Sequence, residues 1–265
     1  FVSPLSGLLA FVGLQLYILG PTGSINLPYD SLLVNFGQLL TMPHVVSYVL
    51  VAVPGVITLI TGFRTARRRQ AAGLSARSMG GVLLQAAVIT IVLELIVLYL
   101  NRSRGVPWMF VLFVGLVMVM NYAFRRTQWG RSMTAIGGNR EAARRAGINV
   151  RLIYASAFAL CATFAAAGGM MSAARLASSS QQAGTGDVNL NAIAAAVIGG
   201  TSLFGGRGSA YSALLGIIVI QSIASGLTLL DLSSSLRYMI TGGVLAIAVI
   251  VDSLARRSRV SHGRA

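Results

Sequence analysis

One stretch of the sequence, GGTSLFGGRG at residues 199–208, has the glycine-rich composition of a phosphate-binding loop. A Walker A loop also requires a lysine that reaches the β- and γ-phosphates of ATP. All 21 basic residues of this chain are arginine. We therefore expect no ATP hydrolysis by this polypeptide, so any coupling to ATP has to come from a partner. The glycines are better suited to a tight turn at a membrane boundary.

Glu94 is the acidic residue that lies well inside a long apolar run, residues 79–100. Ionisable side chains within membrane spans are costly and are therefore candidates for function. Thr90 precedes Glu94 by one helical turn and shares its face. Glu94 could line a polar pathway or relay a proton. The alternative interpretation is that its carboxylate simply pairs with an arginine near the interface or with polar groups of the helix bundle.

Residues that bind metals are scarce. Cys161 is the single cysteine of the chain, which excludes an internal disulfide framework and a cysteine-based metal site. The two histidines, His44 and His262, are far apart in the sequence. We expect no metal site and no cofactor.

The longest connection between apolar runs, residues 125–150, contains the signals of a short helix at 140–146. Asn139 can act as the N-cap, and Glu141 lies in the first turn, where the helix dipole favours an anion. Gly147 suits the position just after the helix. At 1.5 Å per residue, such a helix is about 10 Å long.

This short helix has the composition of a docking element. Its alanines are predicted to share one small, smooth face, and its arginines occupy the rest: Ala142, Ala143 and Ala146 against Arg140, Arg144 and Arg145. Such a face suits insertion into the groove of a partner protein. An ordinary arginine-rich connecting loop is the alternative interpretation.

The elements that carry these residues are apolar and long. The chain is 55% hydrophobic and 10% charged, with a mean hydropathy of +0.76. Stretches long enough to cross about 30 Å of hydrocarbon recur, which predicts an all-α integral membrane bundle of about eight spans. The arginines that give the net charge of +15 lie between these stretches, so we expect no nucleic-acid partner. The stretches are residues 1–19, 44–63, 79–100, 106–124, 151–174, 190–206, 209–230 and 237–254.

The arginines give these stretches an orientation. If every stretch crosses, 17 arginines lie on one side, in 64–78, in 125–151, at Arg207 and in the C-terminal tail, and four lie on the other. By the positive-inside rule, the first side is cytoplasmic. This bias favours a crossing by residues 190–206, a cytoplasmic C-terminus and an extracytoplasmic loop at 20–43.

Three segments, in this order along the chain, resemble the permease subunits of sugar ABC importers of the ribose/xylose/arabinose type. They are GRSMTAIGGNREAARRAGINV (130–150), AGTGDVNLNAIAAAVIGGTSLFGGRGS (183–209) and SGLTLLDLSSSLRYMITGGVLAIAVIVDS (225–253). The earlier segments ARRRQAAGLSARS (66–78) and RGVP (104–107) are most similar to the xylose branch of that group.

The resemblance implies that the short helix is a coupling helix, which docks on a cytoplasmic ATP-binding subunit. The other partners it implies are an extracytoplasmic sugar-binding protein, a second permease copy forming a homodimer, and the lipid of a bacterial inner membrane. The coupling residues would be Gly137, Gly138, Asn139, Glu141, Ala142, Ala143 and Gly147.

Residues 1–265 are then one transmembrane permease domain. Family permeases begin with further helices, and this chain starts at Phe1 inside an apolar run. We therefore expect that its N-terminal helices are missing.

The predicted mechanism is alternating access, driven by closure of the partner ATPase. Neutral polar groups and small residues should line a sugar pathway. The candidates, which include the buried acid, are Glu94, Asn191, Thr201, Ser202, Gln221 and Ser225.

The sequence is also compatible with other functions. Related permeases carry branched-chain amino acids, nucleosides or autoinducers, and the sequence does not name the solute. A secondary transporter driven by protons, with Glu94 as the carrier, is a second class of function. A membrane-embedded interaction protein without transport is a third, which the features of the 125–150 connection disfavour.

Overall fold

A computed structural model describes most of the chain, and in it five helices are long and apolar enough to cross a membrane. The residues described are 2–71, 78–184, 188–203, 205–233, 235–236, 238–244, 246–247 and 249–250, with residues 2–5 as backbone alone. The five helices are α3 (His44–Ala71), α4 (Met79–Asn101), α5 (Trp108–Arg126), α8 (Val150–Leu176) and α10 (Ala210–Leu229).

These helices confirm the predicted all-α membrane fold. Two further apolar helices, α1 (Val2–Leu19) and α9 (Val188–Ile198), correspond to the predicted stretches at 1–19 and 190–206. The predicted span at 237–254 and the arginines of the C-terminal tail lie wholly or partly outside the described residues, so eight spans stay a prediction.

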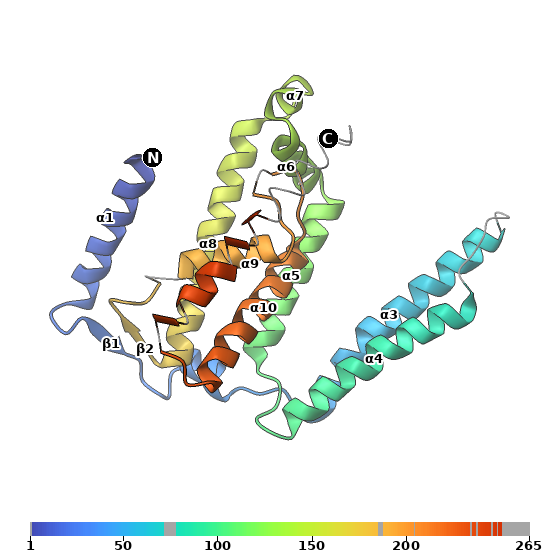
Figure 1. Cartoon of the computed structure of the whole chain (residues 1–265), viewed down its shortest axis with the longest axis horizontal. Coiled ribbons are helices and arrows are strands. Elements are labelled where there is room, and N and C mark those ends of the chain that lie inside the picture. Colours follow the sequence, from blue (N-terminus) through green and yellow to red (C-terminus); the bar gives the residue numbers. More distant parts are fainter. Residues whose placement is uncertain are drawn as a thin grey trace. The chain divides into compact units, whose positions relative to one another are not determined.

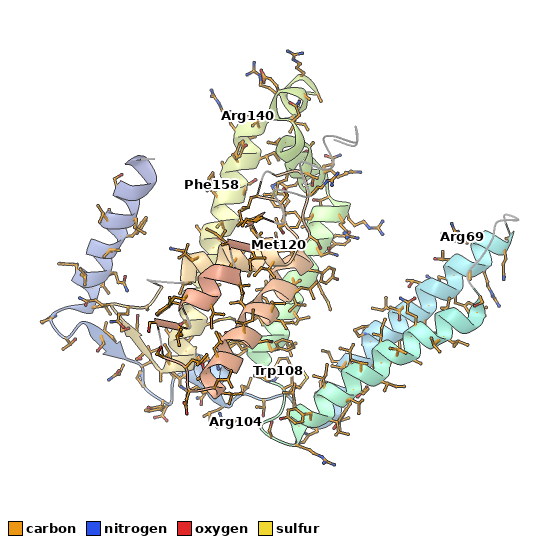
Figure 2. All side chains as sticks on the ribbon, in the orientation of Figure 1. Arg69, Arg104, Trp108, Met120, Arg140 and Phe158 are labelled. Atoms are coloured by element: carbon orange, nitrogen blue, oxygen red, sulfur yellow. The ribbon has the colours of Figure 1, made fainter. Side chains whose placement is uncertain are left out.

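Large apolar side chains point outward from these helices, as Figure 2 shows for Phe158 on α8. Leu84, Tyr99 and Phe158 are exposed by 70%, 76% and 73%. In water such surfaces would be a liability, whereas lipid tails solvate them as well as another leucine does. The exposed apolar surface therefore fits a bilayer environment.

The contacts divide the chain into two compact units, one formed by residues 29–111 and the other by 1–28 with 112–265. In the 29–111 unit, α3 and α4 form an antiparallel hairpin (Figure 1). Gly55 lies directly against Thr90, and Gly62 lies directly against Val82, because neither glycine carries a side chain that would hold the helices apart.

Two short elements, α2 (Leu32–Val34) and the π-helix η1 (Asn35–Leu39), precede α3 in the chain. Hydrogen bonds close one end of the hairpin. Met42 N–H donates to the Val106 carbonyl oxygen at 2.8 Å, and the Asn101 amide donates to Ser47 Oγ at 3.0 Å. Figure 2 shows Arg69 and Arg104 at opposite ends of the hairpin, as the arginine pattern predicts.

The second unit holds α1, most of α5, and α6 to α10. A two-stranded antiparallel ribbon joins α1 to the end of α8, with β1 (Ser24–Asn26) paired to β2 (Ser178–Ser180). The Gln15 side-chain amide also donates to the Ser180 carbonyl at 3.1 Å. If every apolar stretch crosses, the connections that contain β1 and β2 both lie on the extracytoplasmic side, and the pairing of the two strands at one end of the unit agrees with this.

The helix α9 is shorter than the predicted stretch at 190–206. Its 11 residues span about 16 Å, roughly half of the hydrocarbon thickness, so α9 does not cross by itself. The helix ends at Ile198, and Gly200 then adopts a positive φ of +98°, which glycine tolerates and other residues rarely do. The prediction of one continuous helix over this stretch is therefore wrong.

Candidate functional site

The connection at 125–150 folds into two helices, α6 (Gln128–Gly138) and α7 (Arg140–Arg145), at one end of the second unit (Figure 1). Contacts of Thr127, Gly130 and Trp129 fix the turn between α5 and α6. Thr127 Oγ1 accepts the Gly130 N–H at 3.2 Å, and Gly130 packs directly on the backbone at Phe124. The Trp129 ring stacks on Phe124 at 5.5 Å, and its indole N–H donates to Ser156 Oγ on α8 at 2.7 Å.

The predicted start of the short helix is confirmed. Asn139 has extended dihedral angles (φ −152°, ψ 106°), and its side-chain Oδ1 accepts the Ala142 N–H at 3.0 Å. This is the geometry of an N-cap, in which the side chain satisfies a backbone donor that has no partner within the helix.

The predicted end of the helix is confirmed as well. Gly147 has a φ of +82°, and its N–H donates to the Arg144 carbonyl at 3.1 Å. The Ile148 N–H donates to the Ala143 carbonyl at 3.1 Å. Together these two bonds form a Schellman motif, which needs a residue that accepts the left-handed conformation. Both ends of α7 are therefore set by local hydrogen bonds.

The orientation of α7 differs from the prediction. Ala143 is 4% exposed and packs in a cluster with Ile136 of α6 and Val150 of α8. Ala142 and Ala146 are exposed. The three alanines therefore do not form one outward face, because Ala143 seats the helix on α6 and α8. The residues that receive Ala143 were not found from the sequence, since an isoleucine and a valine in an apolar chain carry no distinctive signal.

The exposed surface of α7 is basic. A salt bridge joins Arg144 to Glu141 at 3.9 Å, and both side chains are mostly exposed, so the pair contributes little stability. The Arg140 guanidinium lies over the Tyr154 ring of α8 at 5.8 Å, a cation–π distance. Figure 2 shows Arg140 beside α7, at the end of the unit. A basic surface of this kind suits a partner groove that carries negative charge.

The loop between α9 and α10 reaches this same end. The Gly137 backbone at the end of α6 lies directly against Gly206. The arginine pattern predicts that Arg207 lies on the same side as residues 125–151, and this contact agrees with that prediction. Thr201 and Ser202, predicted to line a sugar pathway, lie in this loop rather than on a helix.

The other predicted pathway residues are distributed over three helices. Asn191 is half-buried on α9, while Gln221 and Ser225 are exposed on α10, where the Gln221 amide donates to Ser225 Oγ at 3.5 Å. Glu94 is half-buried on α4, in the other unit. Their role in a pathway stays a prediction.

We expect Asn139→Ala to loosen α7. Loss of an N-cap costs about 1 kcal/mol, which raises the unfolded fraction of the helix about fivefold. Trypsin cleavage after Arg144 and Arg145 in inside-out vesicles measures this fraction, because a protease cuts the unfolded segment. Asn139→Asp, which can still cap, is the control. Equal cleavage rates for the two variants would contradict the assignment of the cap.

Comparison with known proteins gives one family. The model of the branched-chain amino acid transport system / permease component family matches residues 29–249. The chain is similar to the xylose transport system permease protein XylH of Escherichia coli (strain K12), with 34% identity over 257 residues, 97% of this chain and 64% of that protein. XylH of Haemophilus influenzae is 31% identical over 254 residues, which cover 96% of this chain and 66% of that protein.

A third relative matches over a shorter region. The ribose import permease protein RbsC of Escherichia coli (strain K12) is 39% identical over 158 residues, 58% of this chain and 48% of that protein. The chain thus spans slightly less than two thirds of the length of the xylose permeases it matches. No solved structure matches the chain.

Proposed function

Because the chain belongs to the branched-chain amino acid transport system / permease component family, we propose that it forms the membrane-spanning part of an ABC importer for a monosaccharide. The similarity to XylH over 97% of this chain carries the proposal and favours xylose or another pentose as the solute. In this role the chain is not an enzyme, and a separate ATPase subunit hydrolyses the ATP.

The geometry of α7 supports the proposed site of energy input. The helix is capped at both ends, seated on α6 and α8 through Ala143, and exposes a basic surface. We propose that this surface docks on the cytoplasmic ATPase subunit. Closure of the ATPase dimer on ATP would then displace α7 and drive alternating access. A helix held this firmly can pass on a displacement that a mobile loop would absorb.

The remaining partners follow from the same role. A secreted sugar-binding protein would deliver the solute at the end that carries the β1–β2 ribbon, and a second copy of the permease would complete the pathway. The transporter would reside in the inner membrane of a bacterium, with α7 and the C-terminus in the cytoplasm, as the arginine distribution favours.

We expect the complete transporter, reconstituted with its ATPase and binding protein, to accumulate a pentose only when ATP is supplied inside the vesicles. Competition among individual pentoses then identifies the solute. No uptake of any pentose, together with uptake of a branched-chain amino acid or a nucleoside, would overturn the choice of substrate class.

The same vesicles test the proton-driven alternative. We expect Glu94→Gln to keep ATP-dependent accumulation and to keep it insensitive to an uncoupler, because ATP binding supplies the energy. In a proton carrier, removing this carboxylate would abolish accumulation, since no group would bind the proton. An uncoupler that stops uptake by the unmodified transporter would contradict the ABC proposal.

A further inference from the structure

Four glycines bring the α6 end and the α9–α10 loop into direct backbone contact, which we call the glycine contact: Gly137, Gly138, Gly205 and Gly206. The Gly137 backbone lies against the Gly206 amide. A methyl group on Gly205 would lie 2.8 Å from the Gly137 carbonyl oxygen, and one on Gly206 would lie 3.1 Å from the Gly138 Cα. Almost any side chain at Gly137 or Gly205 would separate the two segments. Figure 1 shows the loop beside α6.

The loop side of this contact is a compact turn. Gly205 and Gly206 have φ values of +85° and +74°, where other residues would be strained. The Ser202 N–H donates to the Arg207 carbonyl at 3.1 Å, and the Gly205 N–H donates to the Ser202 carbonyl at 3.2 Å. These two bonds tie Ser202 to Gly205 and Arg207 within the loop.

The loop is also fastened to the α9–α10 hairpin. The Thr201 N–H donates to the Ala196 carbonyl at 2.9 Å, so the loop continues directly from α9. The two helices are packed backbone to backbone, with Gly216 of α10 directly against Ala195 of α9. Any displacement of the loop would therefore act on both helices.

The α6 side of the contact is continuous with α7. Asn139 is the single residue between the two helices, and its N–H donates to the Ala135 carbonyl of α6 at 3.0 Å. Ala143 holds α7 against Ile136 of the same helix. The segment α6–α7 is thus one bent, packed element whose α6 end touches the loop.

We infer that the glycine contact transmits the displacement of α7 to the α9–α10 hairpin, which makes Gly137, Gly205 and Gly206 positioning residues for transport. This inference rests on the proposed function, because it takes the ATPase as the source of the displacement. A purely structural role for the four glycines is the alternative, and it predicts no separation of ATP hydrolysis from sugar uptake.

The first experiment compares Gly205→Ala with Gly200→Ala in the complete reconstituted transporter. Both glycines lie in the α9–α10 loop with a positive φ, +85° and +98°, so alanine is strained at both positions. A methyl group at Gly200 meets nothing within 4 Å, whereas one at Gly205 would lie 2.8 Å from the Gly137 carbonyl oxygen. We expect Gly205→Ala to retain its bound ATPase and its ATP hydrolysis while uptake per ATP falls about tenfold, because the tightly packed contact has no room for a methyl group. Gly200→Ala should stay within about twofold of the unmodified protein on both measures.

A second experiment needs no glycine variant. Spin labels at Ala146→Cys on α7 and Arg207→Cys in the loop, in a Cys161→Ser background, report the distance between two exposed positions. We expect this distance to stay the same in the nucleotide-free and ATP-trapped transporter. A shift of more than about 3 Å, comparable to known helix displacements, would overturn the inference.

Different results separate the inference from the proposed function. Normal uptake per ATP in Gly205→Ala, or equal losses of hydrolysis and uptake, would overturn the inference alone. Absence of ATP-dependent uptake by the unmodified transporter would overturn the proposed function, and this inference with it.

Discussion

Replacing Ala143 with tryptophan is expected to abolish sugar uptake by the assembled transporter. Ala143 is 4% exposed and fills the space between Ile136 and Val150, so the indole ring has no room there. Overpacking of this kind typically costs about 1–3 kcal/mol and displaces backbone. Here it would lift α7 off α6 and α8, so that the helix could no longer receive or pass on a displacement. Uptake of labelled pentose into proteoliposomes measures the effect.

Ala142→Trp is the matched control, because Ala142 is exposed on the same helix. The tryptophan fits there without disturbing the seat of α7, so trypsin should cleave after Arg145 no faster than in the unmodified protein. In Ala143→Trp this cleavage should accelerate. Loss of uptake by Ala142→Trp without faster cleavage would support docking of the exposed surface on the ATPase. Full uptake by Ala143→Trp would rule out α7 as the coupling element.

Replacing Gly216 with alanine is expected to destabilise the α9–α10 hairpin strongly. A methyl group at this position collides with the backbone at Ala195, which cannot move aside as a flexible side chain could. We expect a loss of about 1–3 kcal/mol, despite the higher helix propensity of alanine. The apparent Tm of the purified protein in detergent should fall by several degrees, and the yield of monodisperse protein should fall with it.

Gly226→Ala on the same helix should not destabilise the protein. A methyl group at Gly226 meets nothing within 4 Å, so the substitution brings the helix propensity of alanine without a collision. The apparent Tm should stay the same or rise slightly. If Gly216→Ala and Gly226→Ala behave alike, the close approach of α9 and α10 is not present in the native protein.

The helix ends at the candidate site were predictable because they depend on local interactions. Asn139 bonds a backbone N–H three residues later, and Gly147 needs only its own positive φ and the carbonyls of the preceding turn. Such signals are contained in a few consecutive residues. The absence of lysine and the apolar stretches are equally properties of the sequence itself.

Contacts between distant segments were not predictable in this way. The sequence predicted α7 but not that Ala143 faces inward, because the position of Ile136 and Val150 relative to α7 depends on how three helices pack. The pairing of β1 with β2 joins segments more than 150 residues apart, and three-residue strands carry no periodic signal.

The glycines show most clearly which features the sequence determines and which depend on the packing of distant segments. In a membrane, lipid-facing and helix-facing positions are both apolar, so the hydrophobic pattern does not distinguish them. Gly168 and Gly169 meet nothing within 4 Å, whereas Gly199 and Gly216 lie directly against the backbone of a neighbouring helix. The sequence by itself determined the fold class and the ends of α7. The tertiary structure decided which face of α7 is buried and which glycines touch, because these depend on the approach of segments that the sequence does not place together.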